Sequence, residues 1–395
     1  MMNKIKAQIQ EVFHEIAEGL ETGHFGAKVS VGLTLLGSEL APDNLFQGAY
    51  SFAKQNPGVE VVAIGEKLLE ELPNLTLVEA RSEAEQHQVM EQLLDSGRIQ
   101  ACVTQHYNFP IGVATVGRVI TPGRGKPMMV ATTTGTAAAH RVVAMVQNAI
   151  AGIIAAKSVG IERPTLGVLN VDGARKVEQS LQQLKDNGYE FDFVTSERAD
   201  GGAVMRGNDV LLGTPDVLVT DTLTGNILMK MFSSATTGGT YESSGYGYGP
   251  GIGEGYERNV LILSRVSGIP VVANALDYAA TLVRHQLNRV AKAEYEAANQ
   301  AGLKKLTEQL LQADAPADKQ EEAVEPPKEV TTAQVSGIDI MELEDAVQAL
   351  WRAGIYAQSG MGCTGPIVLI NEERIDAAMK VLLEAGYPSN LHVDC

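Results

Sequence analysis

Short apolar runs alternate with helical patterns from Ala27 to about Val290. The strand-like runs are "AKVSVGLT", "VEVVAIG", "IQACVTQ", "KPMMVAT", "PTLGVLN", "PDVLVTD", "RNVLILS" and "IPVVANA". Nearly continuous apolar strands that alternate with helices are typical of a mainly parallel sheet covered by helices on both faces. Such sheets bind ligands in the loops beyond the carboxyl ends of their strands. The pattern therefore predicts a large α/β domain over residues 1–311, with its site in those loops.

The hydrophobic pattern stops abruptly at residues 312–334, "QADAPADKQEEAVEPPKEVTTAQ". Alanine, proline, glutamate and lysine dominate this stretch, and large apolar residues are almost missing from it. A segment of this composition cannot bury enough apolar surface to fold by itself. We predict an acidic, flexible linker.

Residues 335–395 show a pattern of their own. Two amphipathic helices are predicted in "MELEDAVQALWRAGIYA" and "NEERIDAAMKVLLEAGYPS", which end near Gly354 and Gly386. Strand-like runs lie before, between and after them, so the order is β-α-β-β-α-β, the ferredoxin-like pattern. The prediction is a small α+β domain, in which "SGMGCTGPIVL" connects the second and third strands.

Composition narrows the function classes. The chain has 31 Lys and Arg against 48 Asp and Glu, a net charge of −17, and no basic patch that would attract nucleic acid or anionic lipid. Residues 1–20 have the spacing of an amphipathic helix and not of a signal peptide. The apolar stretch that begins at Val142 contains Gln147, Asn148 and Lys157, which suits a buried helix. We therefore expect a soluble, cytoplasmic protein.

The chain has three cysteines at wide spacing, without a C-x-x-C pair. Neither a disulfide framework nor a metal site is indicated, and no cofactor is expected. Cys102 lies in a predicted strand, and Cys395 is the terminal residue. Cys363 stands between Gly362 and Gly365, whose N–H groups can stabilise a thiolate and whose small size leaves room for an acyl group. The alternative is that Cys363 is a small buried hydrophobe.

Hydroxyl and glycine residues gather at two predicted strand-to-helix junctions. The first group is Thr132, Thr133, Thr134, Gly135 and Thr136, and the second is Asp221, Thr222, Thr224, Gly225 and Asn226. Backbone N–H groups at a helix start, with hydroxyls beside them, can bind an anion such as phosphate. Capped turns without a ligand are the alternative for each group.

The segment 236–259, "TTGGTYESSGYGYGPGIGEGYERN", is rich in glycine and tyrosine. It contains neither G-x-G-x-x-G nor the Walker pattern, so neither a dinucleotide fold nor a P-loop is indicated. A mobile lid over the strand ends is one interpretation. An ordered structural loop or a dimer contact is the other.

Several blocks of the chain resemble the phosphate acyltransferases of bacterial phospholipid synthesis. These blocks are "DVLVTDTLTGNILMK", the stretch from Leu35 through "VVAIG", "ERPTLGVLN" with "DGARK", and "VVANALDYA". The resemblance covers residues 27 to about 290 and extends to the phosphotransacetylases, which share the fold; it implies a phosphate acyltransferase-like fold and a homodimer. Where the phosphate acyltransferases have His-Gly-Ser, this chain has "LSRVSG", with Ser264 and Arg265.

The whole chain, with its glycine-rich segment, acidic linker and "SGMGCTGPIVL" motif, resembles the alpha subunit of component C of the clostridial glycine, sarcosine or betaine reductase complex. In that family a selenoprotein, component A, carries a carboxymethyl group, and component C receives it as an acetyl thioester that inorganic phosphate cleaves to acetyl phosphate. The resemblance implies a ketoacyl-synthase-like beta subunit as a partner. It also implies that Cys363, in the matching motif, carries the acetyl group.

These observations form one hypothesis. Cys363 holds the acetyl thioester on the small domain, and the two threonine-rich turns bind phosphate in the large domain. Asp221 orients or deprotonates the phosphate, or caps its helix instead, and Lys230 or Arg265 neutralises charge. The alternatives are an acyl-carrier-protein:phosphate acyltransferase of lipid synthesis and a non-catalytic scaffold subunit. The choice of amine belongs to another component.

Overall fold

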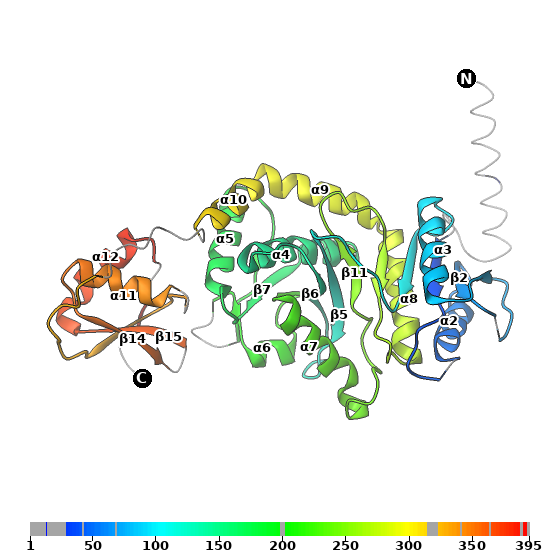
Figure 1. Cartoon of the computed structure of the whole chain (residues 1–395), viewed down its shortest axis with the longest axis horizontal. Coiled ribbons are helices and arrows are strands. Elements are labelled where there is room, and N and C mark those ends of the chain that lie inside the picture. Colours follow the sequence, from blue (N-terminus) through cyan, green and yellow to red (C-terminus); the bar gives the residue numbers. More distant parts are fainter. Residues whose placement is uncertain are drawn as a thin grey trace, which may run out of the picture.

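The computed structural model describes residues 13, 29–41, 43–67, 69–197, 202–313, 323–339, 342–362, 365–387 and 390–392. Within them lie a 12-stranded sheet and a separate four-stranded sheet. Figure 1 shows the large sheet with helices on both faces and the small unit beside it. The predicted amino-terminal helix, apart from residue 13, lies outside the described residues, and so does the linker segment 314–322. The proposed domain boundaries stay predictions.

The large sheet is mixed but mostly parallel, as predicted. Its strands lie in the order β3 (Leu75–Glu79), β2 (Val59–Gly65), β1 (Val29–Thr34), β4 (Ala101–Thr104), β12 (Val260–Ile262), β11 (Gly249–Ile252), β5 (Val113–Ile120), β6 (Pro127–Thr136), β10 (Val217–Val219), β7 (Thr165–Leu169) and β8 (Asp192–Phe193), and β9 (Val204–Met205) also pairs with β7. β11 is antiparallel to both of its neighbours, and β5 is antiparallel to β6. The two parallel blocks on either side of β11 and β5 therefore run in opposite directions.

Helices cover both faces of this sheet because its strands are apolar on both sides. One face carries α2 (Asn44–Gln55), α4 (Arg141–Lys157), α5 (Ala174–Asp186), α8 (Ile269–Arg284), α9 (Leu287–Gln300) and α10 (Leu303–Ala313). The other carries α3 (Glu83–Asp95), α6 (Gly207–Leu212) and α7 (Thr222–Ser234), which the 3-10 turn η1 (Ala235–Thr237) follows. Each face has its own hydrophobic core. None of the helices in the described ranges is long and apolar enough to cross a membrane.

One sequence-based expectation is wrong in this part of the chain. "IPVVANA" is not a strand but the first half of α8, where Pro270 occupies the first turn. A proline is tolerated there because the first N–H groups of a helix have no partner inside it. Val271, Val272, Ala275 and Leu276 are buried at helical spacing, so the run has the period of a helix and not of a strand.

The later part of the glycine-rich segment is ordered, which agrees with the second of its two interpretations and not with a lid. Residues Gly249–Ile252 form β11 inside the large sheet, and Tyr248 is 3% exposed. Gly249 has φ +81°, and a Cβ there would lie 1.7 Å from the carbonyl oxygen of Val116. The glycines therefore allow close strand contact, as the alternative of an ordered loop implies. Residues 238–241 are exposed at the surface.

The small sheet belongs to the carboxy-terminal unit, which the structure describes between residues 333 and 392. Its elements are β13 (Ala333–Ser336), α11 (Leu343–Arg352), β14 (Ala357–Gly362), β15 (Gly365–Ile370), η2 (Glu372–Arg374), α12 (Ile375–Glu384) and β16 (Asn390–His392). The strand order is β14-β15-β13-β16, and every pair is antiparallel. This arrangement is ferredoxin-like and confirms the predicted fold class.

The carboxy-terminal unit contacts the large unit at the start of α5. Asp339 Oδ2 accepts a hydrogen bond of 3.0 Å from the backbone N–H of Gly173, the N-cap residue of α5. Lys176 Nζ lies 3.4 Å from Glu342 Oε1, and both side chains are partly exposed. Because Gly173 has no side chain, a carboxylate from the other unit supplies the cap of this helix.

Candidate active site

A pocket of about 600 Å³ lies on the α7 face of the large sheet. Its lining comes from the segments directly after β4 and β12, from the end of β6, and from α7. The lining residues are Glu39, Gln105, His106, Tyr107, Asn108, Phe109, Thr134, Gly135, Asn226, Lys230, Tyr248, Ile262, Leu263, Ser264, Arg265 and Val266. The pocket therefore lies beyond the ends of β4 and β12, with α7 forming the opposite wall.

Thr132 to Thr136 do not form a turn at a helix start, as the sequence pattern suggested. They belong to strand β6, and α4 begins only at Arg141. Thr132 Oγ1 donates to the carbonyl of Thr115 at 2.6 Å, and Thr133 Oγ1 donates to the carbonyl of Tyr248 at 2.8 Å. Both side chains are buried. These bonds join β6 to β5 and to the residue before β11. Both hydroxyls therefore have hydrogen-bond partners without a ligand.

Five of the predicted site residues do line the pocket. They are Thr134, Gly135, Asn226, Lys230 and Arg265. Asn226 Nδ2 donates to the carbonyl of Thr133 at 3.0 Å, which joins α7 to β6 and leaves the amide a second N–H. Thr136 is exposed and lies outside the lining.

The start of α7 follows β10 directly, as predicted, but its first polar residues serve the helix. Asp221 accepts from the N–H of Thr224 at 3.1 Å and from its hydroxyl at 2.7 Å. Arg141 lies 3.2 Å from the same carboxylate. Burial raises the pKa of Asp221, but the bonds from Thr224 and the charge of Arg141 outweigh burial and lower it overall. Thr222 donates to the carbonyl of Gly135 at 3.0 Å.

The pocket lining does not include Asp221, Thr222, Thr224 or Gly225. These residues instead position the start of α7 against β6. Asp221 acts as a helix cap, the second of the two roles that the sequence left open. Gly225 lets α7 approach β6, because a Cβ at this position would lie 1.8 Å from the carbonyl oxygen of Thr132.

Lys230 is the cation of the pocket that makes no ion pair among the described residues. Its Nζ lies 5.6 Å from the centre of the Tyr248 ring. The Tyr248 hydroxyl donates to Glu242 at 2.7 Å, and Glu242 is 2% exposed. Arg265 differs from Lys230, since it pairs with Glu83 at 2.9 Å. An anion in the pocket meets Lys230 as its available positive charge.

Sequence reasoning missed the wall formed by Gln105, His106, Tyr107 and Asn108. These polar residues follow β4 without a break, and "IQACVTQ" was identified as a strand. Their place directly after a buried parallel strand was the available signal. Cys102 in this strand is fully buried, which confirms the prediction for it, and burial raises the pKa of its thiol.

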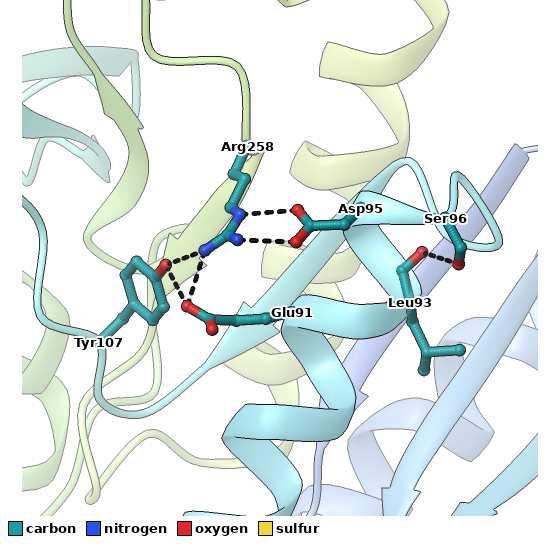
Figure 2. Close-up of polar contacts among 6 residues, drawn as sticks. All are labelled: Glu91, Leu93, Asp95, Ser96, Tyr107 and Arg258. Carbon is teal, nitrogen blue, oxygen red and sulfur yellow. Dashed lines mark hydrogen bonds and ion pairs between the residues drawn. The ribbon is translucent and has the colours of Figure 1, made fainter.

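A charged cluster behind the pocket holds Tyr107 in place (Figure 2). Arg258 Nε and Nη2 donate to the two carboxylate oxygens of Asp95 at 2.9 and 2.8 Å. Its Nη1 donates to Glu91 at 2.7 Å and to the Tyr107 hydroxyl at 3.0 Å. Burial and the bond to Glu91 raise the pKa of Tyr107. The cluster joins α3 and the segment before β12 to the pocket wall.

We expect Arg258→Ala to lower the free energy of unfolding by about 1–2 kcal/mol, because a bidentate pair and two further bonds are lost together. Urea unfolding measures the change. Arg163→Ala is the control, since Arg163 makes one ion pair of 3.1 Å with Asp192 and is mostly exposed. Equal effects of the two substitutions would contradict the role of the cluster.

The structure does not bring the described carboxy-terminal unit to this pocket. Gly362 and Gly365 pair with each other at the end of the β14–β15 hairpin, and neither lines the pocket. Cys363 and Thr364 lie outside the described residues, as does Cys395. No group of His, Cys, Asp and Glu suited to a metal occurs among the residues that the structure describes.

Comparisons with known proteins match most of this chain. The family model described as "Fatty acid synthesis protein" matches residues 29–369. The glycine/sarcosine/betaine reductase complex component C subunit alpha of Peptoclostridium acidaminophilum is 58% identical over 385 residues, which cover 98% of this chain and 99% of that protein.

More distant relatives cover less of the chain. A phosphate acyltransferase of Thermotoga petrophila is 26% identical over 234 residues, 51% of this chain and 67% of the relative. The crystal structure of a branched-chain phosphotransacylase from Enterococcus faecalis V583 is 16% identical, covers 65% of this chain and 99% of its own, and has a TM-score of 0.41. From the family model and the component C relative together, the chain belongs to the family of component C alpha subunits of glycine/sarcosine/betaine reductase complexes.

Proposed function

We propose that this chain transfers an acetyl group from an enzyme-bound thioester to inorganic phosphate and releases acetyl phosphate, as a subunit of component C. The observation that carries the proposal is the pocket, where the ammonium of Lys230, which makes no ion pair with any residue that the structure describes, lies with the amide of Asn226 and with Thr134 and Gly135. The phosphate acyltransferase relatives support phosphate as the acceptor.

Cys363 carries the acetyl group in this proposal. A phosphate oxygen attacks the thioester carbonyl carbon and forms the new C–O bond. The C–S bond then breaks, and the sulfur leaves as a thiolate with the electron pair. Lys230 neutralises the charge of phosphate, and a preorganised N–H donor stabilises the developing oxyanion. Asn226 is such a donor, because α7 and the bond to Thr133 fix its amide.

The hairpin that flanks Cys363 reaches the pocket only when the carboxy-terminal unit leaves its present position. Two of its contacts with α5, a hydrogen bond to a backbone N–H and a partly exposed ion pair, are individually weak, and this supports such a movement. The predicted flexible linker is long enough to allow this movement of the carboxy-terminal unit. The beta subunit and selenoprotein that the resemblance implies supply the acetyl group to Cys363.

Arsenolysis of acetyl phosphate by the purified chain tests the proposal. Acetyl phosphate acetylates Cys363 in the reverse direction, arsenate replaces phosphate in the forward direction, and the unstable acetyl arsenate hydrolyses. We expect Lys230→Ala to lower the rate at least about 100-fold, the typical loss when one transition-state donor is removed. Lys292→Ala is the control, since Lys292 is exposed on α9.

No arsenolysis by the wild-type chain would overturn the proposal and favour a scaffold subunit. Arsenolysis of long-chain acyl phosphates that does not require Cys363 would instead favour an acyl-carrier-protein:phosphate acyltransferase, the alternative that the family relatives support.

A further inference from the structure

The side chain of Gln105 is buried but makes no hydrogen bond. It is 8% exposed, and neither Nε2 nor Oε1 has a partner in the described part of the chain. Buried amides are normally satisfied, because an unmade hydrogen bond leaves the full desolvation cost of the group. Gln86 shows the ordinary case, since it is 2% exposed and bonds both the N–H and the carbonyl of Leu36 at 3.0 Å.

Gln105 stands where a ligand would reach it. It is the first residue after β4 and lines the same pocket as Lys230. Gly37 packs against it with φ +105°, and a Cβ on Gly37 would lie 2.9 Å from Gln105 Oε1. Because Gly37 has no Cβ, it leaves space for the amide of Gln105. Both amide atoms are covered, but no hydrogen bond opposes rotation of the side chain into the pocket.

The charges of the pocket indicate which anion suits this amide. Lys230 attracts an anion, whereas the carboxylate of Glu39 in the same lining repels one that has no proton to donate. An amide can donate through Nε2 and accept through Oε1 at the same time. Phosphate that carries one proton offers both P–O⁻ and P–OH, whereas sulfate near neutral pH offers acceptors alone.

We infer that Gln105 is a specificity-determining residue that binds protonated phosphate in this pocket, donating to one phosphate oxygen and accepting from its P–OH group. The inference rests on the proposed function for the choice of phosphate as the ligand. In this inference the amide of Gln105 makes hydrogen bonds only when the ligand is bound. The buried, unbonded amide therefore lowers the folding stability of the ligand-free protein.

Calorimetric titration of the full chain with inorganic phosphate and with sulfate tests the inference. We expect the wild-type protein to bind phosphate at least about tenfold more tightly than sulfate. Gln105→Leu should weaken phosphate binding by about tenfold or more and remove the preference over sulfate. Gln105→Glu keeps the shape but adds a negative charge and removes the donor, so it should weaken phosphate binding further. The control Gln55→Leu replaces an exposed glutamine on α2 and should change neither anion's affinity.

Thermal unfolding of a matched pair provides the second measurement. Gln86→Leu should lower the melting temperature, because it leaves both backbone groups of Leu36 without a partner. Gln105→Leu, the same change at similar burial, should leave the melting temperature unchanged or raise it. A decrease for Gln105→Leu as large as that for Gln86→Leu would overturn the inference, because the amide would then serve the fold.

Failure of this inference can be separated from failure of the proposed function. If phosphate binding depends on Gln105 but the chain catalyses no arsenolysis, the phosphate site stands and the catalytic proposal falls. If arsenolysis proceeds and Gln105→Leu binds phosphate like the wild-type chain, the assignment of Gln105 is wrong. A wild-type chain that does not bind phosphate, or does not prefer it to sulfate, would also overturn the assignment.

Discussion

Replacing Cys363 with alanine is expected to abolish acetyl labelling of the chain and arsenate-dependent breakdown of acetyl phosphate. The reason is chemical, because alanine offers no sulfur to form the thioester from which phosphate takes the acetyl group. The fold should persist, since β14 and β15 already pair from Ala357↔Ile370 to Gly362↔Gly365. Mass spectrometry of the chain after incubation with labelled acetyl phosphate measures the first effect, and circular dichroism checks the second.

Two other cysteine substitutions are the controls for this experiment. Cys102→Ala removes a buried thiol from the core, and Cys395→Ala removes the terminal thiol. Both variants should still be labelled at Cys363. Cys102→Ala should lose about 1–2 kcal/mol of stability through the small cavity it creates. Labelling that survives in Cys363→Ala would refute the assignment of the acetyl carrier.

Gly225→Ala is expected to lower the free energy of unfolding by about 3 kcal/mol or more. Its Cβ would lie 1.8 Å from the carbonyl oxygen of Thr132, and backbone atoms of β6 cannot turn away as a flexible side chain can. α7 must therefore move off the strand. Because α7 carries Asn226 and Lys230, arsenolysis should fall together with stability. Urea unfolding and the arsenolysis rate measure the two effects.

Gly207→Ala is the matched control, because it makes the same change at the start of another helix. A Cβ on Gly207 would have no atom within 4 Å, and its φ is not in the left-handed region. Alanine is the better helix former, so this variant should be neutral or slightly stabilised. A Gly225→Ala protein as stable as Gly207→Ala would show that α7 does not need this close approach.

The fold class could be predicted because it depends on local patterns. Apolar runs and helical spacing identified most strands of the large sheet, and the two helix-ending glycines located the ferredoxin-like unit. β11 was missed because it consists of Gly249, Pro250, Gly251 and Ile252, which have little strand propensity. β11 forms because it packs between β12 and β5, where only glycine fits at position 249 beside the carbonyl of Val116.

Some residues that line the pocket could be identified from local sequence patterns, whereas others could not. Lys230 and Asn226 were found because a helix start after a strand is recognisable in sequence. Thr132 and Thr133 were considered as phosphate ligands because sequence does not show that their hydroxyls already bond the carbonyls of Thr115 and Tyr248. Gln105 could not be distinguished from Gln86, because the difference between them is the presence or absence of partners in space.

The hydrogen bond from Gly173 to Asp339 makes the docking of the carboxy-terminal unit on α5 sensitive to salt. The hydrogen bond from Gly173 to Asp339 and the ion pair between Lys176 and Glu342 together contribute about 1–3 kcal/mol to this contact. Loss of these two contacts would raise the population of the separated state roughly 5- to 150-fold. Each visit to that state exposes the N–H groups at the start of α5, and added salt lengthens the visits by screening the two carboxylates. Higher ionic strength thus shifts the balance from docked toward separated units.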